Sequence, residues 1–167
     1  MFRRRSIADW LSAGKRVPVP RLPEFELPRF LGEWYEIARI DTWFERGLSH
    51  VRAFYEASGD GELRIVNRGL HDKSGRWKER RARAVPDGAP NFLKVYFVPF
   101  VAGRYRVACV DTEYRRALVS GGSLRYAWVL ARTPSLTDEE LVPFLRMAEE
   151  LGYDPRRFLR TRQGGES

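Results

Sequence analysis

Eight short segments with alternating apolar and polar residues, separated by turn residues, constrain the fold most strongly. Turns rich in glycine, aspartate and proline, such as residues 58–61 and 86–90, are typical of connections between antiparallel strands. No segment alternates with a helical pattern, so we expect one antiparallel sheet whose edges are removed by closure into a barrel. The predicted strands cover residues 32–40, 50–57, 62–69, 76–85, 91–98, 104–111, 115–120 and 124–132.

One helix is predicted after the last strand. Thr137 and Glu140 have the spacing of a capping box, and the apolar residues that follow recur on one helical face. We expect this face to pack on the outside of the barrel. Residues 41–48 are too long for a hairpin turn and include two aromatic rings, which favours a loop over a barrel mouth.

The length of 167 residues suits a single domain with its own core. We assign residues 23–167 to this domain and residues 1–22 to a flexible extension. The formal net charge of +8 suits anionic partners such as nucleic acid, a membrane surface or an acidic ligand head group, but we favour a solvated basic barrel exterior as its cause. Cys109 is the only cysteine, which excludes an intramolecular disulfide.

The first residues do not resemble an export signal. Residues 1–5 are basic, and residues 6–12 are too short and too polar for the apolar core of a signal peptide. No cysteine is present there to receive a lipid, so the chain as written predicts a cytoplasmic protein. A short basic helix at residues 6–13 that touches a membrane is the alternative to a loose tail.

Charged residues show which side chains face the interior, because charges favour solvent and neighbours alternate between faces. In residues 32–40, Trp34, Glu36 and Ala38 share one face. The rule also turns Cys109 inward. We expect the remaining lumen residues to be Val51, Ala53, Tyr55, Leu63, Ile65, Arg80, Leu93, Val95, Phe97, Tyr105, Val107, Tyr126 and Trp128.

This lumen is apolar and aromatic, which is the composition of a small-molecule cavity. A barrel completely filled by these side chains is the alternative. Two charged residues lie on the inward face, Glu36 and Arg80, and each needs a partner if buried. They could pair with each other, or Arg80 could bind the phosphate or carboxylate of a ligand.

Three regions carry a family resemblance. The run Gly-x-Trp-Tyr-Glu-Ile-Ala-Arg begins at Gly32 and includes Trp34, an Asp-x-x-Tyr pattern joins Asp111 to Tyr114, and Arg132 ends the last strand. In this order they resemble the signature regions of the lipocalins, and more narrowly the bacterial lipocalin (Blc) and apolipoprotein D branch.

The resemblance implies an all-β fold, an eight-stranded antiparallel up-and-down lipocalin barrel with one C-terminal α-helix packed outside. It also implies an apolar ligand cavity and a tryptophan and arginine stacked at the closed end. The branch implies fatty acids or lysophospholipids as ligands, a role in membrane maintenance, and a location in the cell envelope.

We therefore expect non-enzymatic binding, storage or transport of lipid-like amphiphiles, with no cofactor. His50 and His71 lack metal-ligand spacing, and no motif supports catalysis. One alternative is an enzyme that uses Cys109, and another is a basic surface that binds nucleic acid or membrane. Nucleic acid is not expected as a partner, whereas a membrane surface and a homodimer remain open.

Overall fold

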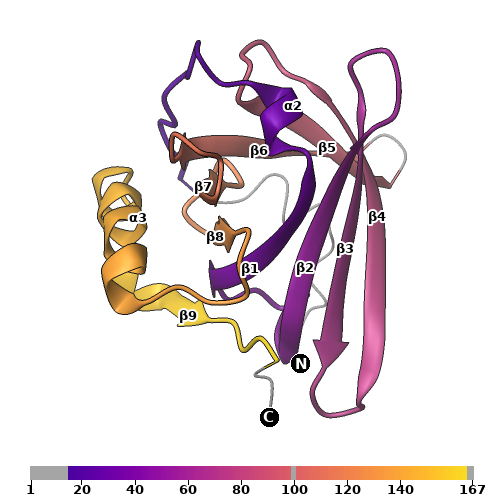
Figure 1. Ribbon diagram of the computed structural model, residues 1–167, viewed down its shortest axis with the longest axis vertical. Helices are drawn as coiled ribbons and strands as arrows, with labels where there is room; N and C mark the ends of the chain where they lie inside the picture. The colour runs from indigo at the N-terminus through magenta and orange to yellow at the C-terminus, as the bar shows by residue number, and fades with distance from the viewer. Residues whose placement is uncertain (1–14, 99–100, 165–167) are drawn as a thin grey trace.

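The computed structural model describes residues 15–98 and 101–164, which form a single closed antiparallel sheet with one long helix outside it (Figure 1). The strands are β1 (Gly32–Ile40), β2 (Leu48–Ala57), β3 (Leu63–His71), β4 (Arg76–Pro86), β5 (Phe92–Val98), β6 (Val101–Val110), β7 (Arg116–Ser120), β8 (Ala127–Ala131) and β9 (Phe158–Arg160). The short elements are the helix α2 (Leu27–Phe30) and the 3-10 turn η1 (Pro155–Arg157).

The first eight strands form the predicted barrel. Each pairs with the next in antiparallel register from β2 to β8, and β1 lies between β8 and β2 and closes the ring. Only the first half of β1 pairs with β2, from Gly32 to Tyr35. The last residues of that same edge of β1 pair with β9 instead, so the chain end replaces β2 near the open end.

The helix α3 (Asp138–Glu150) lies outside the barrel, as predicted. Its capping box is present, since Thr137 Oγ1 accepts from the backbone N–H of Glu140 and the Glu140 carboxylate accepts from the N–H of Thr137. Leu141, Phe144 and Ala148 are buried against the outer faces of the neighbouring strands. This packing leaves the barrel interior free of the helix.

Two β-bulges change which side chains face the lumen. The register shifts between Glu36 and Ala38 in β1, and between Val107 and Cys109 in β6. An extra residue in one strand reverses the alternation beyond it. The structure therefore corrects two expectations: Ala38 and Cys109 pack in the outer cluster beneath α3, and neither faces the lumen.

The segment before α2 runs along the outside of the barrel. Arg16 forms an isolated bridge with Ser123, and the N–H of Leu22 donates to Asn91 Oδ1 at 3.0 Å. Residues 15–22 are therefore fixed to the barrel wall, while the helix predicted at residues 6–13 lies outside the described residues. No helix among the described residues is long and apolar enough to cross a membrane.

Candidate ligand-binding site

The barrel interior contains a cavity of about 120 Å³ that opens at one end of the barrel. Sequence-predicted residues that line it are Glu36, Val51, Ala53, Tyr55, Ile65, Arg80, Val95, Phe97, Tyr105 and Trp128. Alternation places most of these side chains correctly, because each strand is regular over most of its length.

Four other predicted lumen residues do not line the cavity. Leu63, Leu93 and Val107 are buried deeper, in the apolar core that fills the closed end. Tyr126 is buried in the connection between β7 and β8, with its ring stacked on Trp128 at a centroid distance of 6.5 Å. The predicted set did not include several further lining residues, among them Phe44, Glu45, Leu48, Asn67, Lys78 and Val119.

Two tyrosines bound the cavity at its inner end. The hydroxyls of Tyr55 and Tyr105 are 2.6 Å apart, and one donates to the other. Burial raises the pKa of both phenols above the ordinary value, so both remain neutral. Below them the rings of Phe30 and Trp34 fill the barrel. An apolar chain that enters from the mouth would end against this uncharged pair.

The closed end is held by Arg132. Its guanidinium lies 3.9 Å from the ring centroid of Trp34 and donates to backbone carbonyls in α2, β1 and the turn before β7. Gly32 has φ +96°, and a Cβ there would lie 3.4 Å from Arg132 Nη1. The backbone conformation therefore favours glycine at this position, while an added Cβ would only make van der Waals contact with the arginine.

Asp111 and Tyr114 shape the same end. Asp111 Oδ1 accepts from the backbone N–H groups of Arg115 and Arg116, at 2.6 and 3.2 Å. The Tyr114 hydroxyl accepts from the N–H of Glu26 at 2.8 Å, and Tyr114 itself has φ +55°. Both residues therefore order the turn between β6 and β7, which is far from the cavity mouth.

The connection between β1 and β2, residues 41–47, crosses the open end. Phe44 lies beside Tyr126, and the Arg80 guanidinium lies 5.4 Å from the centre of the Phe44 ring. The N–H of Asp72 donates to the carbonyl of Gly47 at 2.9 Å, which ties the loop to the turn between β3 and β4. The loop therefore narrows the cavity mouth.

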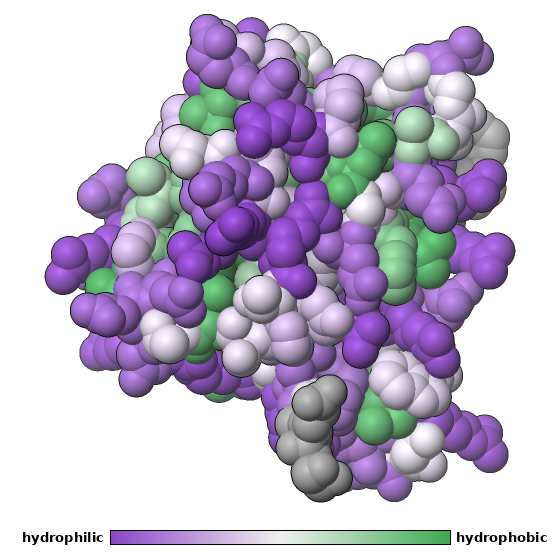
Figure 2. All heavy atoms as spheres, in the orientation of Figure 1, coloured by the Kyte–Doolittle hydropathy of each residue, from purple (hydrophilic) through white to green (hydrophobic). Residues whose placement is uncertain are grey.

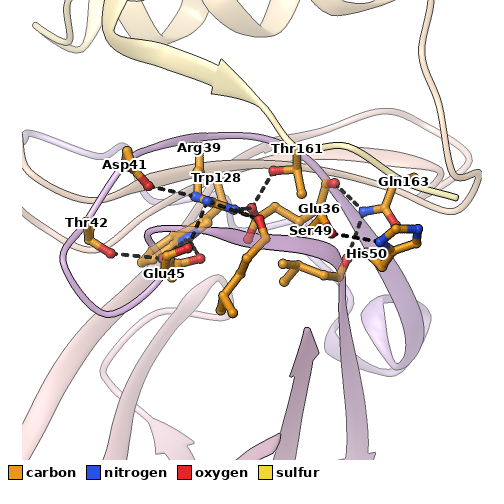
Figure 3. A network of polar contacts seen from close by, with 12 residues as sticks. Glu36, Arg39, Asp41, Thr42, Glu45, Ser49, His50, Trp128, Thr161 and Gln163 are labelled. Atoms are coloured by element: carbon orange, nitrogen blue, oxygen red, sulfur yellow. Dashed lines mark hydrogen bonds and ion pairs between the residues drawn. The ribbon is translucent and has the colours of Figure 1, made fainter. Parts of the chain in front are cut away.

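A buried network of charged and polar groups fixes this loop (Figure 3). Arg39 donates to Glu36 Oε1 at 2.8 Å and to the carbonyl of Glu45 at 2.9 Å. Thr161 also donates to Glu36 Oε1, at 2.5 Å. The alternative pairing of Glu36 with Arg80 is absent, since Glu36 pairs with Arg39.

The Glu45 carboxyl lies between this network and the cavity. Its Oε1 accepts from Trp128 Nε1 at 3.0 Å and from Thr42 Oγ1 at 3.4 Å. Burial, reinforced by the charge of Glu36, raises the pKa of Glu45 well above its ordinary range. The nearby Glu36 carboxylate thus favours the protonated, neutral form of Glu45.

We expect Glu45→Gln to remove a pH dependence of stability. The unfolded chain releases the Glu45 proton near pH 4.5, the ordinary pKa, whereas the folded protein retains it. Stability of the wild type therefore falls as pH rises above about 5, by up to about 1.4 kcal/mol per pH unit, until the folded pKa is passed. Glutamine resembles the neutral acid, so urea unfolding of the variant should lack this slope; an identical slope would contradict the assignment.

The thiol and the histidines show no catalytic arrangement. Burial raises the pKa of Cys109 to about 11, so the thiol is neutral at physiological pH. Nδ1 of His50 and of His71 each lie 2.8 Å from a serine hydroxyl. Within residues 15–98 and 101–164, no group of three potential ligands could hold a metal ion.

A closed eight-stranded antiparallel barrel with an outer helix and an apolar cavity open at one end defines a class of small-molecule-binding proteins. The chain belongs to the lipocalin family, because the lipocalin-like domain matches residues 25–163. Lobster apocrustacyanin A1 has a similar fold, with a TM-score of 0.72 and 22% identity over 91% of this chain and 90% of that chain.

Closer sequence relatives are bacterial. The chain is 43% identical over 144 residues to the outer membrane lipoprotein Blc of Escherichia coli K12, covering 84% of this chain and 81% of the relative. It is 42% identical to Blc of Vibrio cholerae, over 87% and 86% of the two chains. Apolipoprotein D of Macaca fascicularis is 32% identical, over 80% and 74%. The resemblance seen in the three signature regions is thus confirmed.

Proposed function

We propose that the protein binds lipid-like amphiphiles, fatty acids or lysophospholipids, for storage or transport in membrane maintenance. The single observation that carries this proposal is the polarity gradient along the cavity. The inner end is apolar and finishes on the neutral hydroxyls of Tyr55 and Tyr105, whereas unpaired cations lie at the mouth. An amphiphile with an acyl tail and an anionic head has the same gradient.

The tail would occupy the inner part of the cavity. The apolar residues that line this part come from β2, β3 and β5 and are Val51, Ala53, Ile65, Val95 and Phe97. Each buried methylene of a ligand contributes about 0.8 kcal/mol. A single acyl chain therefore gains most of its affinity there without any ionic contact.

The head would lie near Arg80 and Lys78. Both line the cavity from β4 and are exposed towards the mouth. Neither forms an ion pair with another described residue, and Arg80 lies over the Phe44 ring. A guanidinium in this position can bind a carboxylate or phosphate with two hydrogen bonds.

The relatives support a place in the cell envelope. Those of Escherichia coli and Vibrio cholerae are named outer membrane lipoproteins, and a carrier for membrane lipid components would act beside the membrane. We extend this location to the present protein as part of the proposal. Lipocalins are generally binding and transport proteins rather than enzymes, which agrees with a non-catalytic role.

The test compares Arg80→Gln with Arg83→Gln, since Arg83 lies on the same strand but points outward to Glu62. Titration of delipidated protein with a fatty acid, followed by tryptophan fluorescence, should show affinity about two- to fivefold lower for Arg80→Gln only. A long-chain alcohol should bind both variants equally. If no long-chain ligand gives a saturable change, the proposal fails.

A salt titration separates lipid carriage from nucleic-acid binding. One paired head group gives a shallow salt dependence, whereas a protein that neutralises several phosphates loses orders of magnitude in affinity between low and physiological salt. We expect the fatty acid to show the shallow dependence. If the affinity for a short RNA depends steeply on salt and no fatty acid binds, the basic surface would be assigned to nucleic-acid binding instead.

A further inference from the structure

Two exposed tryptophans lie at the open end of the barrel. Trp43 is 48% exposed in the loop of residues 41–47, and Trp77 is 49% exposed near the start of β4. The other exposed large apolar side chains of the described residues, Val142 and Leu159, lie on α3 and β9. Large exposed rings are unfavourable in water, so a pair at one end of the molecule indicates an interaction surface.

Both rings are held in position. The Arg68 guanidinium lies 4.6 Å from the ring centroid of Trp77, and the His50 ring meets it edge-on. Trp43 packs edge-on against Phe44 at 5.7 Å. The loop and the β3–β4 hairpin are in direct contact through the hydrogen bond of Gly47 with Asp72. The two tryptophans therefore belong to neighbouring segments around the cavity mouth.

The same end carries much of the positive charge. Residues 68–81 contain six basic and two acidic side chains, within a chain of net charge +8. Both acidic side chains are already paired, Asp72 with Arg162 and Glu79 with Arg81. Hydrophilic side chains project from this end of the molecule, beside a smaller apolar area (Figure 2). This segment therefore carries a net positive charge that its own acidic side chains do not neutralise.

Amphipathic indole rings favour the interface between lipid and water, and basic side chains beside them are attracted by anionic head groups. We propose that the open end of the barrel docks on the surface of an anionic lipid bilayer. Trp43 and Trp77 then lie among the head groups and the β3–β4 hairpin lies on the lipid phosphates. This orientation turns the cavity mouth towards the bilayer, and it goes beyond the ligand class proposed above.

Lipid fits this surface better than a single-stranded nucleic acid does. Bases bind by stacking on open aromatic faces, but the Arg68 guanidinium already lies over the Trp77 ring. The ring next to Trp43, that of Phe44, meets it edge-on and so does not continue a stack of parallel faces for successive bases. An interfacial position needs only that part of each ring enters the head-group layer.

The test is sedimentation of the full-length chain with vesicles of phosphatidylcholine, with and without phosphatidylglycerol. We expect binding only with the anionic lipid. The Lys73→Gln/Arg76→Gln variant should bind about 25-fold more weakly, since each cation near such a surface is worth about fivefold. Trp43→Ser/Trp77→Ser should also bind more weakly. Matched controls are Arg64→Gln, at the closed end of β3, and Leu159→Ser, which should bind within about twofold of wild type.

Three outcomes would overturn the docking proposal. These are no binding to anionic vesicles, equal binding with and without phosphatidylglycerol, and equal losses in the test and control variants. A short RNA that binds wild type but not the charge variant, while vesicles do not bind, would assign the surface to nucleic acid. Fatty-acid titration and thermal melting of every variant distinguish failure of docking from failure of the cavity proposal or of folding.

Discussion

Replacing Arg39 with methionine should lower the free energy of unfolding by about 3–5 kcal/mol, the usual result of breaking a buried ion pair. The side chains of Arg39 and Glu36 are 6% and 5% exposed, so water cannot replace the lost cation. The change also removes the donors that Arg39 supplies to the carbonyls of Glu45 and Leu48. Urea unfolding at neutral pH measures the loss.

The double variant Glu36→Leu/Arg39→Met is the matched control. Replacing both partners of a buried pair with apolar residues is often neutral or stabilising, so the double variant should be more stable than Arg39→Met alone. A loss below about 1 kcal/mol for Arg39→Met would show that the network contributes little. A double variant less stable than the single variant would show that Glu36 acts mainly through Thr161.

Arg132→Ala should lower the unfolding free energy by about 2–4 kcal/mol while the folded protein still binds ligand normally. Stacking on Trp34 contributes about 0.5–2 kcal/mol, and bonds from a charged donor to carbonyls add to this. The melting temperature should fall by about 4–16 °C, given about 2–4 °C per kcal/mol for a chain of this size.

Arg132→Lys provides the comparison, because lysine keeps the charge but not the planar group of donors. It should regain only part of the stability. The prediction is specific because Arg132 lies away from the cavity. The Tyr55–Tyr105 pair lies between the arginine and the cavity along the barrel. A large loss of ligand affinity at unchanged melting temperature would contradict the structural role.

Alternation of charged and apolar residues predicted most of the fold because it holds over most of each strand, outside the bulges. Val51, Ala53 and Tyr55 in β2 illustrate this, with Arg52 between two buried neighbours. Strand ends were less predictable. The last barrel strand begins at Ala127 rather than near residue 124, because the N–H of Gly121 bonds the carbonyl of Tyr126 and closes a turn there.

The buried network was missed because the bulge in β1 is not visible to a rule of strict alternation. Glu36 and Arg39 are three residues apart, a spacing that puts them on opposite faces of a regular strand. The bulge between Glu36 and Ala38 brings them together. Two opposite charges at an odd spacing, among apolar residues in the second half of the strand, were the available signal. Glu45 gave no such signal, because it lies in a loop rather than in a strand.

The sequence also did not predict how deep along the barrel axis each inward-facing side chain lies. Leu63, Leu93 and Val107 face inward as alternation requires, but they belong to the packed core around Phe30 and Trp34 rather than to the cavity. Where core ends and cavity begins depends on the Tyr55–Tyr105 contact, which joins residues 50 positions apart. Alternation gives the face of a side chain but not its height.

The most direct test of the account is the affinity of delipidated protein for a series of fatty acids that differ only in chain length. Each added methylene should strengthen binding by about fourfold, corresponding to about 0.8 kcal/mol, until the chain reaches the tyrosine pair. Beyond that length the affinity should level off. An affinity independent of chain length, or set only by the charge of the head, would contradict binding of the tail inside the barrel.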